Sequence, residues 1–122
     1  MDIIISNATN KPIYDQIASQ IKSLVMSGEL NAGDQLPSIR SLANDLRVSV
    51  ITTKRAYADL EAQGFIETRP GKGSYVAEGN AELLREEYLK RIENHLVQAI
   101  DEAKCAGIDM DNLHEMLDAL TE

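Results

Sequence analysis

Apolar side chains return every three or four residues near the start of the chain, which is the spacing of one face of a helix. The residues concerned are Ile13, Ile17, Ile21, Leu24 and Val25. Pro12 suits the first turn of a helix and Gly28 suits its end. The pattern therefore predicts a helix of about four turns between these two residues, followed by a loop with the sequence GELNAGDQLP.

A second, shorter helix is predicted after Ser38, which follows Pro37 and is suited to cap it. Its apolar positions again repeat at three and four residues; they are Ile39, Leu42, Ala43 and Leu46. Arg47, Val48 and Ser49 then read as a turn.

Ser49 is also placed to cap a third helix, which we expect to end at Gly64. The buried face of this helix is predicted to be Thr53, Ala56, Tyr57 and Leu60. A turn this short forces two short helices to cross steeply. The second and third helices are therefore predicted to form a helix-turn-helix unit.

After Gly64 the pattern changes from helical to β-favouring. Phe65 to Thr68 and Ser74 to Val76 contain aromatic and β-branched residues. Between them, Arg69-Pro70-Gly71-Lys72-Gly73 has the proline and glycines of a hairpin turn. Three helices followed by a two-stranded ribbon indicate a winged helix-turn-helix, with the ribbon as the wing.

The pattern of the C-terminal third predicts a long helix from residue 81 to about residue 106. Apolar residues form one stripe, or seam, along this helix, and charged residues occupy the other positions. Gly107 ends it, and either Asp109 or Asp111 can cap a last helix. A long helix with no further core must bury its seam elsewhere, and a second copy of the chain is the favoured place. The expected dimerisation residues are Leu89, Ile92, Leu96, Ala99, Ala103, Leu113, Leu117 and Leu120.

The formal net charge of -8 is distributed unevenly. Residues 1–78 carry 8 Lys and Arg against 9 Asp and Glu, whereas residues 79–122 carry 4 against 11. Between residues 36 and 75 the balance reverses, with 6 basic and 4 acidic side chains. The first part can therefore meet a polyanion while the acidic arm is repelled from it.

The single cysteine, Cys105, excludes an internal disulfide framework and suits a reducing compartment. The first residues lack the pattern of a signal peptide, and no apolar run reaches the roughly 20 residues of a membrane span. We expect a soluble, cytoplasmic protein without a membrane partner.

Over residues 9–77 the chain resembles the DNA-binding domain of the GntR family of bacterial transcription regulators. The resemblance rests on Pro-Ser-x-Arg at 37–40, Thr-x-x-Arg-Ala-Tyr at 52–57, Leu-x-x-x-Gly-x-Ile at 60–66 and the Gly-Lys-Gly of the wing. The short C-terminal region is similar to the YtrA-like subfamily, in which about two helices replace an effector-binding domain. The resemblance implies a winged helix-turn-helix fold, DNA as the partner and a DNA contact for Arg40.

A recognition helix presents its first turn to the major groove, so the third helix is expected to lie there. Lys54 and Arg55 are within reach of the backbone, and the glycines of the wing allow close approach to the minor groove. The predicted DNA-binding residues are Ser38, Arg40, Ser49, Val50, Ile51, Thr52, Lys54, Arg55, Arg69, Gly71, Lys72 and Gly73.

Two residues depart from the family pattern. Arg47 stands where the turn usually has glycine, and Val50 stands where the recognition helix commonly has arginine. Valine cannot read guanine through two hydrogen bonds as arginine does. The operator is therefore expected to differ from the usual half-site of the family.

Other classes of function find less support. The spacing of Gly64, Gly71 and Gly73 does not fit a phosphate-binding loop of the G-x-x-x-x-G-K-[ST] type. His95, His114 and Cys105 form no catalytic or metal-ligating pattern, so no enzyme activity, metal or cofactor is expected. Tyr57 and Phe65 are interpreted as core residues rather than base-stacking platforms.

The sequence predicts a mainly α protein with a small β-hairpin. Residues 1–78 form a winged helix-turn-helix DNA-binding domain and residues 79–122 a C-terminal helical dimerisation region. The predicted function is a sequence-specific transcriptional regulator, a homodimeric repressor on a palindromic operator; the alternative is a winged helix that binds proteins and has no sequence-specific DNA binding. The sequence identifies no small-molecule effector.

Overall fold

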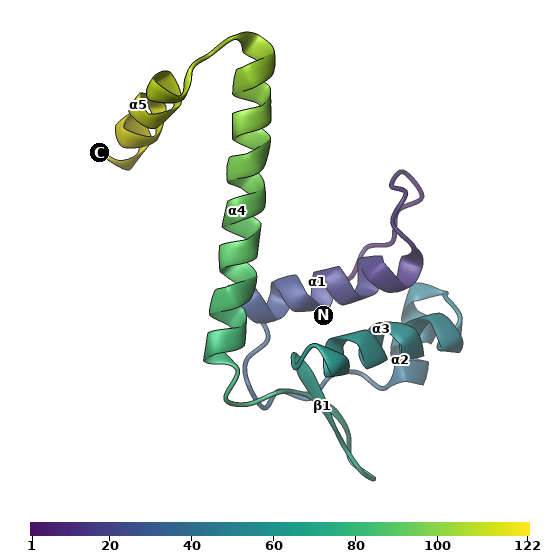
Figure 1. Ribbon diagram of the computed structural model, residues 1–122. Helices are drawn as coiled ribbons and strands as arrows, with labels where there is room; N and C mark the ends of the chain where they lie inside the picture. Colours follow the sequence, from purple (N-terminus) through teal and green to yellow (C-terminus); the bar gives the residue numbers. More distant parts are fainter. The chain divides into compact units, whose positions relative to one another are not determined.

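The computed structural model describes residues 1–122, which divide into two compact units, Met1–Ala81 and Glu82–Glu122 (Figure 1). The N-terminal unit contains α1 (Ile13–Ser27), α2 (Ile39–Leu46) and α3 (Val50–Ala62). The strands β1 (Ile66–Arg69) and β2 (Gly73–Val76) follow α3. The predicted fold class, a mainly helical protein with a small hairpin, is confirmed.

The core of the N-terminal unit forms where α3 packs against both α1 and α2. The largest fully buried side chains come from α1, α3 and the hairpin region; they are Ile17, Ile21, Thr53, Leu60, Phe65 and Val76. The predicted inner face of α3 is buried, as is Phe65. Tyr57 is also a core residue, and its hydroxyl donates a hydrogen bond to the Pro37 carbonyl at 2.8 Å. This burial raises the pKa of Tyr57.

Both helices of the helix-turn-helix begin at the predicted caps. Ser38 Oγ accepts a hydrogen bond from the Ser41 amide at 3.1 Å, and Ser49 Oγ accepts one from the Thr52 amide at 3.0 Å. Arg47 ends α2 in the left-handed conformation, with φ 57° and ψ 44°. It is the one residue other than glycine with a positive φ, so the departure from glycine noted above is accommodated at a conformational cost.

The hairpin differs from the predicted strands by one residue at its ends. Phe65 precedes β1, whereas Arg69 and Gly73 pair with each other instead of belonging to the turn. The turn closes with a hydrogen bond from the Lys72 amide to the Arg69 carbonyl at 2.9 Å. Pro70 and Gly71 occupy its centre, and Gly71 has φ 73°, as a type II turn requires.

Part of the predicted loop GELNAGDQLP pairs with the free edge of β2. The Leu36 amide donates to the Ser74 carbonyl at 2.9 Å, and the Val76 amide donates to the Asp34 carbonyl at 2.8 Å. The segment is a loop, as predicted, but it also forms an isolated bridge between Gln35 and Tyr75 that the sequence did not indicate. Its glycine and polar residues carry no strand signal, and only the neighbouring edge of β2 makes this pairing favourable.

The N-terminal segment is held along α1 by two glutamine side chains one helical turn apart. Gln16 exchanges hydrogen bonds with the amide and carbonyl of Ser6 at 2.9 and 3.0 Å. Gln20 does the same with Ile4 at 2.9 and 2.7 Å. Each amide side chain thus satisfies the backbone donor and acceptor of an extended residue, as a neighbouring strand would.

The C-terminal unit contains most of α4 (Ala81–Ala106) and all of α5 (Met110–Thr121). Gly107 ends α4 with φ 71°. Asp109 rather than Asp111 caps α5, because its carboxylate accepts a hydrogen bond from the Asn112 amide at 2.9 Å. No helix of the chain combines the length and the apolar content needed to span a membrane.

An apolar groove of about 420 Å³ separates α4 from α5. Its lining residues are Leu96, Ala99, Ile100, Met110, Leu113, His114, Met116, Leu117 and Leu120. Ala103 is the one buried residue of the C-terminal unit, at 5% exposure. Of the predicted dimerisation residues, Ala103 is therefore already covered within the protomer, whereas Leu96, Leu117 and the other large ones are partly or largely exposed.

Candidate nucleic-acid interface

The first turn of α3 is open to solvent. Ile51 is 80% exposed and Val50 is 40% exposed, while the buried side of the helix lies at other positions. Ser49 is exposed, but its hydroxyl is engaged, because it donates to Thr52 Oγ1 at 2.7 Å while it caps the helix. The two largest of the predicted groove-facing side chains, Val50 and Ile51, are therefore apolar and exposed.

Four cations of the N-terminal unit have no partner within the chain. Arg40 lies in the first turn of α2 and Arg47 at its end; Lys54 lies in α3 and Lys72 in the turn of the hairpin. All four are exposed, and none forms an ion pair. Charges left uncompensated in the free protein are available to an anionic partner without breaking an internal contact.

Arg55 and Arg69 differ from these four because each is engaged inside the chain. The Arg55 guanidinium lies 3.7 Å from the centre of the Tyr14 ring, which links α3 to α1. A residue predicted to reach DNA thus also joins two helices of the core.

Arg69 forms two hydrogen bonds with Glu67 Oε1, at 2.8 and 3.1 Å, and its guanidinium lies 4.1 Å from the centre of the Tyr75 ring. Residues two apart on a strand share a face, and Tyr75 pairs with Glu67 across the hairpin. The hydrogen bond with Glu67 raises the pKa of Arg69. Arg69, which was predicted to bind DNA, is thus engaged within the wing in the free protein.

The tip of the wing is held in place by groups that sequence reasoning missed. Gln35 Nε2 donates to the Lys72 carbonyl at 3.1 Å, and the Tyr75 hydroxyl donates to the same oxygen at 3.2 Å. Gly73 has φ 108°, and a Cβ there would lie 3.4 Å from Gln35 Nε2. The Lys72 ammonium is thus carried on a fixed backbone. No local signal marks Gln35, which belongs to the segment interpreted as a loop.

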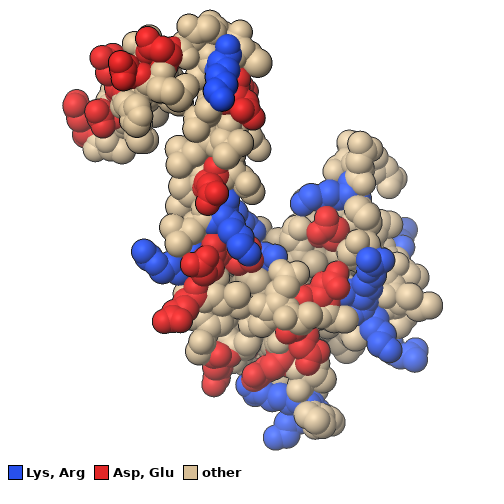
Figure 2. Space-filling view, viewed as in Figure 1, with Lys and Arg blue, Asp and Glu red and all other residues tan.

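The balance of charge differs between the units. Figure 2 shows basic and acidic side chains together on the N-terminal unit, with basic ones over the hairpin, whereas only acidic ones are seen on α5. The chain counts agree, because residues 79–122 carry 11 of the 20 acidic residues and only 4 of the 12 basic ones. The surface suited to a polyanion is therefore confined to the N-terminal unit.

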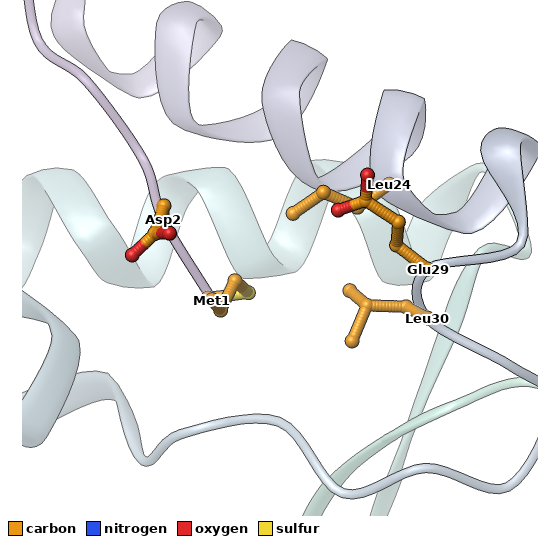
Figure 3. A pocket seen from close by; sticks show the side chains of 5 residues that line it. All are labelled: Met1, Asp2, Leu24, Glu29 and Leu30. Carbon is orange, nitrogen blue, oxygen red and sulfur yellow. The ribbon is translucent and has the colours of Figure 1, made fainter.

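A second hollow lies beside the end of α1. It has a volume of about 220 Å³ and is lined by Met1, Asp2, Leu24, Glu29 and Leu30 (Figure 3). Two carboxylates and three apolar side chains line it, without the lysine and arginine side chains of the basic surface. This acidic and apolar hollow therefore differs in charge from the basic surface of the N-terminal unit.

The side chains that most often ligate metals are dispersed in the structure. No three His, Cys, Asp or Glu side chains lie close enough together to hold a metal ion. Cys105 is exposed and forms no disulfide. His114 lines the apolar groove, where its neighbours are hydrocarbon side chains.

Known proteins with similar sequences are transcription regulators, in agreement with a surface suited to DNA. Residues 13–76 match the family described as bacterial regulatory proteins, gntR family. The HTH-type transcriptional repressor YtrA of Bacillus subtilis (strain 168) is 38% identical over 115 residues, which span 94% of this chain and 88% of YtrA.

Solved structures of transcription regulators have a similar fold. A transcriptional regulator from Oenococcus oeni has a TM-score of 0.84 at 30% identity, covering 97% of this chain and 98% of its own. The DNA-binding domain of AraR in complex with operator ORE1 has a TM-score of 0.54 at 26% identity, covering 63% of this chain and 94% of its own. The chain therefore belongs to the gntR family of bacterial regulatory proteins and is a DNA-binding transcription regulator of the YtrA-like type.

Proposed function

We propose that the protein is a homodimeric repressor that binds a palindromic operator through the first turn of α3, the start of α2 and the wing. The observation that carries this proposal is a set of four exposed, unpaired cations on α2, α3 and the wing: Arg40, Arg47, Lys54 and Lys72. Such a set is suited to phosphates on both sides of a groove occupied by α3.

Each part of this surface has a distinct role. The first turn of α3 enters the major groove with four residues: Ser49, Val50, Ile51 and Thr52. Arg40 and the neighbouring cap residue Ser38 approach the DNA strand that α2 crosses. Lys54 and Arg55 follow the backbone along α3. The wing presents Gly71, Lys72 and Gly73 to the minor groove, with Arg69 bracing the wing behind them.

The C-terminal unit supplies the dimer. A 12-residue helix such as α5 is marginal in water without packing, yet no residue of α5 is buried. A large apolar surface of α4 and α5 is uncovered; it includes Leu89, Ile92 and Leu96 of α4 and Leu117 and Leu120 of α5. A second copy that places its own α5 or α4 in the groove would bury this surface and supply a second α3, which binds a second half-site one or more helical turns away.

Repression follows from occupancy, because a dimer bound across two half-sites blocks a promoter that overlaps them. YtrA of Bacillus subtilis, similar over most of the chain, is named a repressor. A protein acting on a bacterial promoter works in the cytoplasm. Catalysis is not part of this role.

The test is a titration of a selected operator and a random duplex at several salt concentrations. Two copies of the four unpaired cations predict a slope of log affinity against log salt of about -7. Arg40→Ala should make the slope shallower by about 2 and leave the dimer intact. Lys90→Ala, which removes an exposed cation of α4, is the matched control and should leave the slope unchanged.

Two results would contradict the proposal. Affinity independent of salt would exclude binding through phosphates. Equal affinity for operator and random duplex, with a partner protein captured by the same surface, would favour the protein-interaction module instead.

A further inference from the structure

We propose that Ile51 contacts the methyl group of a thymine, so that the operator carries an A·T pair opposite the first turn of α3. This inference rests on the proposed operator binding and names a specificity-determining residue for it. It starts from the exposure of Ile51, which at 80% is the most exposed large apolar side chain of the N-terminal unit.

Ile51 has no structural role in the free protein. The buried side of α3 consists of Thr53, Ala56, Tyr57 and Leu60. Val50, the preceding residue, is 40% exposed and points about 100° away around the helix axis. The helix thus presents two β-branched side chains to solvent at the end that enters the groove, where they neither cap the helix nor pack in the core.

The hydrogen-bonding groups beside Ile51 are largely in use. The single hydroxyl proton of Ser49 is donated to Thr52 Oγ1 at 2.7 Å, and Ser49 Oγ also accepts the Thr52 amide at 3.0 Å. The Thr53 hydroxyl donates to the Ser49 carbonyl at 3.1 Å. Only the Thr52 hydroxyl keeps a free proton for a base acceptor. This turn is therefore poor in hydrogen-bond readout and rich in hydrocarbon.

The major groove contains one apolar group, the C5 methyl of thymine. An isoleucine held against any other base edge would bury polar atoms without hydrogen bonds, which is unfavourable. The four unpaired cations of α2, α3 and the wing suit a polyanion, which favours DNA rather than a protein as the partner that Ile51 meets. Thymine is thus the base that this surface accepts best.

The experiment removes the methyl group from the DNA and the side chain from the protein, separately and together. An operator is selected from a random duplex library with the full-length protein. Each thymine is then replaced singly by deoxyuridine, which lacks only the methyl group. Affinity is measured at one salt concentration for the wild type, for Ile51→Ala and for Ile4→Ala. Ile4 is the matched control, because it is 75% exposed and lies outside α3.

We expect at least one thymine in each half-site whose replacement weakens wild-type binding about fourfold, the effect of one buried methyl group. In Ile51→Ala this loss should disappear, and in Ile4→Ala it should persist.

An operator with no methyl-sensitive thymine, or a loss that is unchanged in Ile51→Ala, would overturn the thymine contact and leave operator binding standing. If selection enriches no sequence at all, the proposed operator binding fails, and the thymine contact fails with it.

Discussion

The N-terminal unit buries its apolar side chains in its own core, whereas the C-terminal unit leaves most of its own exposed. Helices α1 and α3 contribute fully buried isoleucine and leucine side chains, but α4 and α5 together bury only Ala103. The first unit has the core of a domain that folds by itself. The second unit leaves its apolar surface open, and this is the surface that we propose a second copy covers.

The two units also use charge differently. The N-terminal unit leaves four exposed cations unpaired, and the C-terminal unit carries a large acidic excess. Together these differences suggest that one unit is built to meet DNA and the other to meet a copy of itself. Three substitutions test this contrast.

The largest effect is expected for Phe65→Ala. Phe65 is fully buried and also lies beneath the Lys22 ammonium, 5.0 Å from the ring centre. Its truncation should lower the free energy of unfolding by about 3–5 kcal/mol, measured by chemical denaturation of the full chain. Ile51→Ala, on the surface of the same unit, should change it by less than about 0.5 kcal/mol. Similar losses for both variants would contradict the described core.

Leu117→Asp tests the other unit. A charge in the apolar groove should dissociate the dimer to a single chain in sedimentation, because two carboxylates would have to be buried without partners. The loss of one of two linked half-sites should weaken operator binding by about 100-fold or more. Ala119→Asp adds the same charge to α5 outside the groove lining and should do neither. An unchanged mass for Leu117→Asp would place the dimer interface elsewhere.

The smallest effect is expected for Arg47→Gly, which separates stability from binding within the N-terminal unit. Relief of the left-handed conformation should raise the free energy of unfolding by about 0.5–1 kcal/mol. Loss of the cation should weaken DNA binding and make the salt slope shallower by about 2 per dimer. Arg47→Lys keeps both the charge and the strain, and should resemble the wild type. A variant that gains no stability would show that the strain is relaxed in solution.

The helices were predictable because their signals are local. Pro12, Ser38 and Ser49 mark helix starts, and the apolar spacing that follows each of them marks the buried faces. The turn of the wing was predictable for the same reason, since Pro70 and Gly71 have the conformations that a type II turn needs. The choice between Asp109 and Asp111 as the cap of α5 required the structure, because both residues suit the position.

The residues of the candidate site were predictable from the sequence, but the contacts that hold some of them were not. The sequence placed Arg40, Lys54 and Lys72 beside the helix-turn-helix and the wing, and the structure leaves these side chains exposed and unpaired. It could not indicate that Arg55 stacks on Tyr14, because those residues are 41 positions apart in the chain. It also could not indicate that Gln35 supports the wing, because that contact exists only once the segment before α2 pairs with β2.

The sequence by itself thus determined the order and approximate length of the helices, the caps of α2 and α3, the wing and the concentration of acidic residues in the C-terminal third, because these depend on neighbours along the chain. Only the tertiary structure decided which cations stay free for a partner, which apolar side chains remain uncovered and how the wing is braced. Those outcomes depend on residues distant in sequence that meet in space, and no local pattern records them.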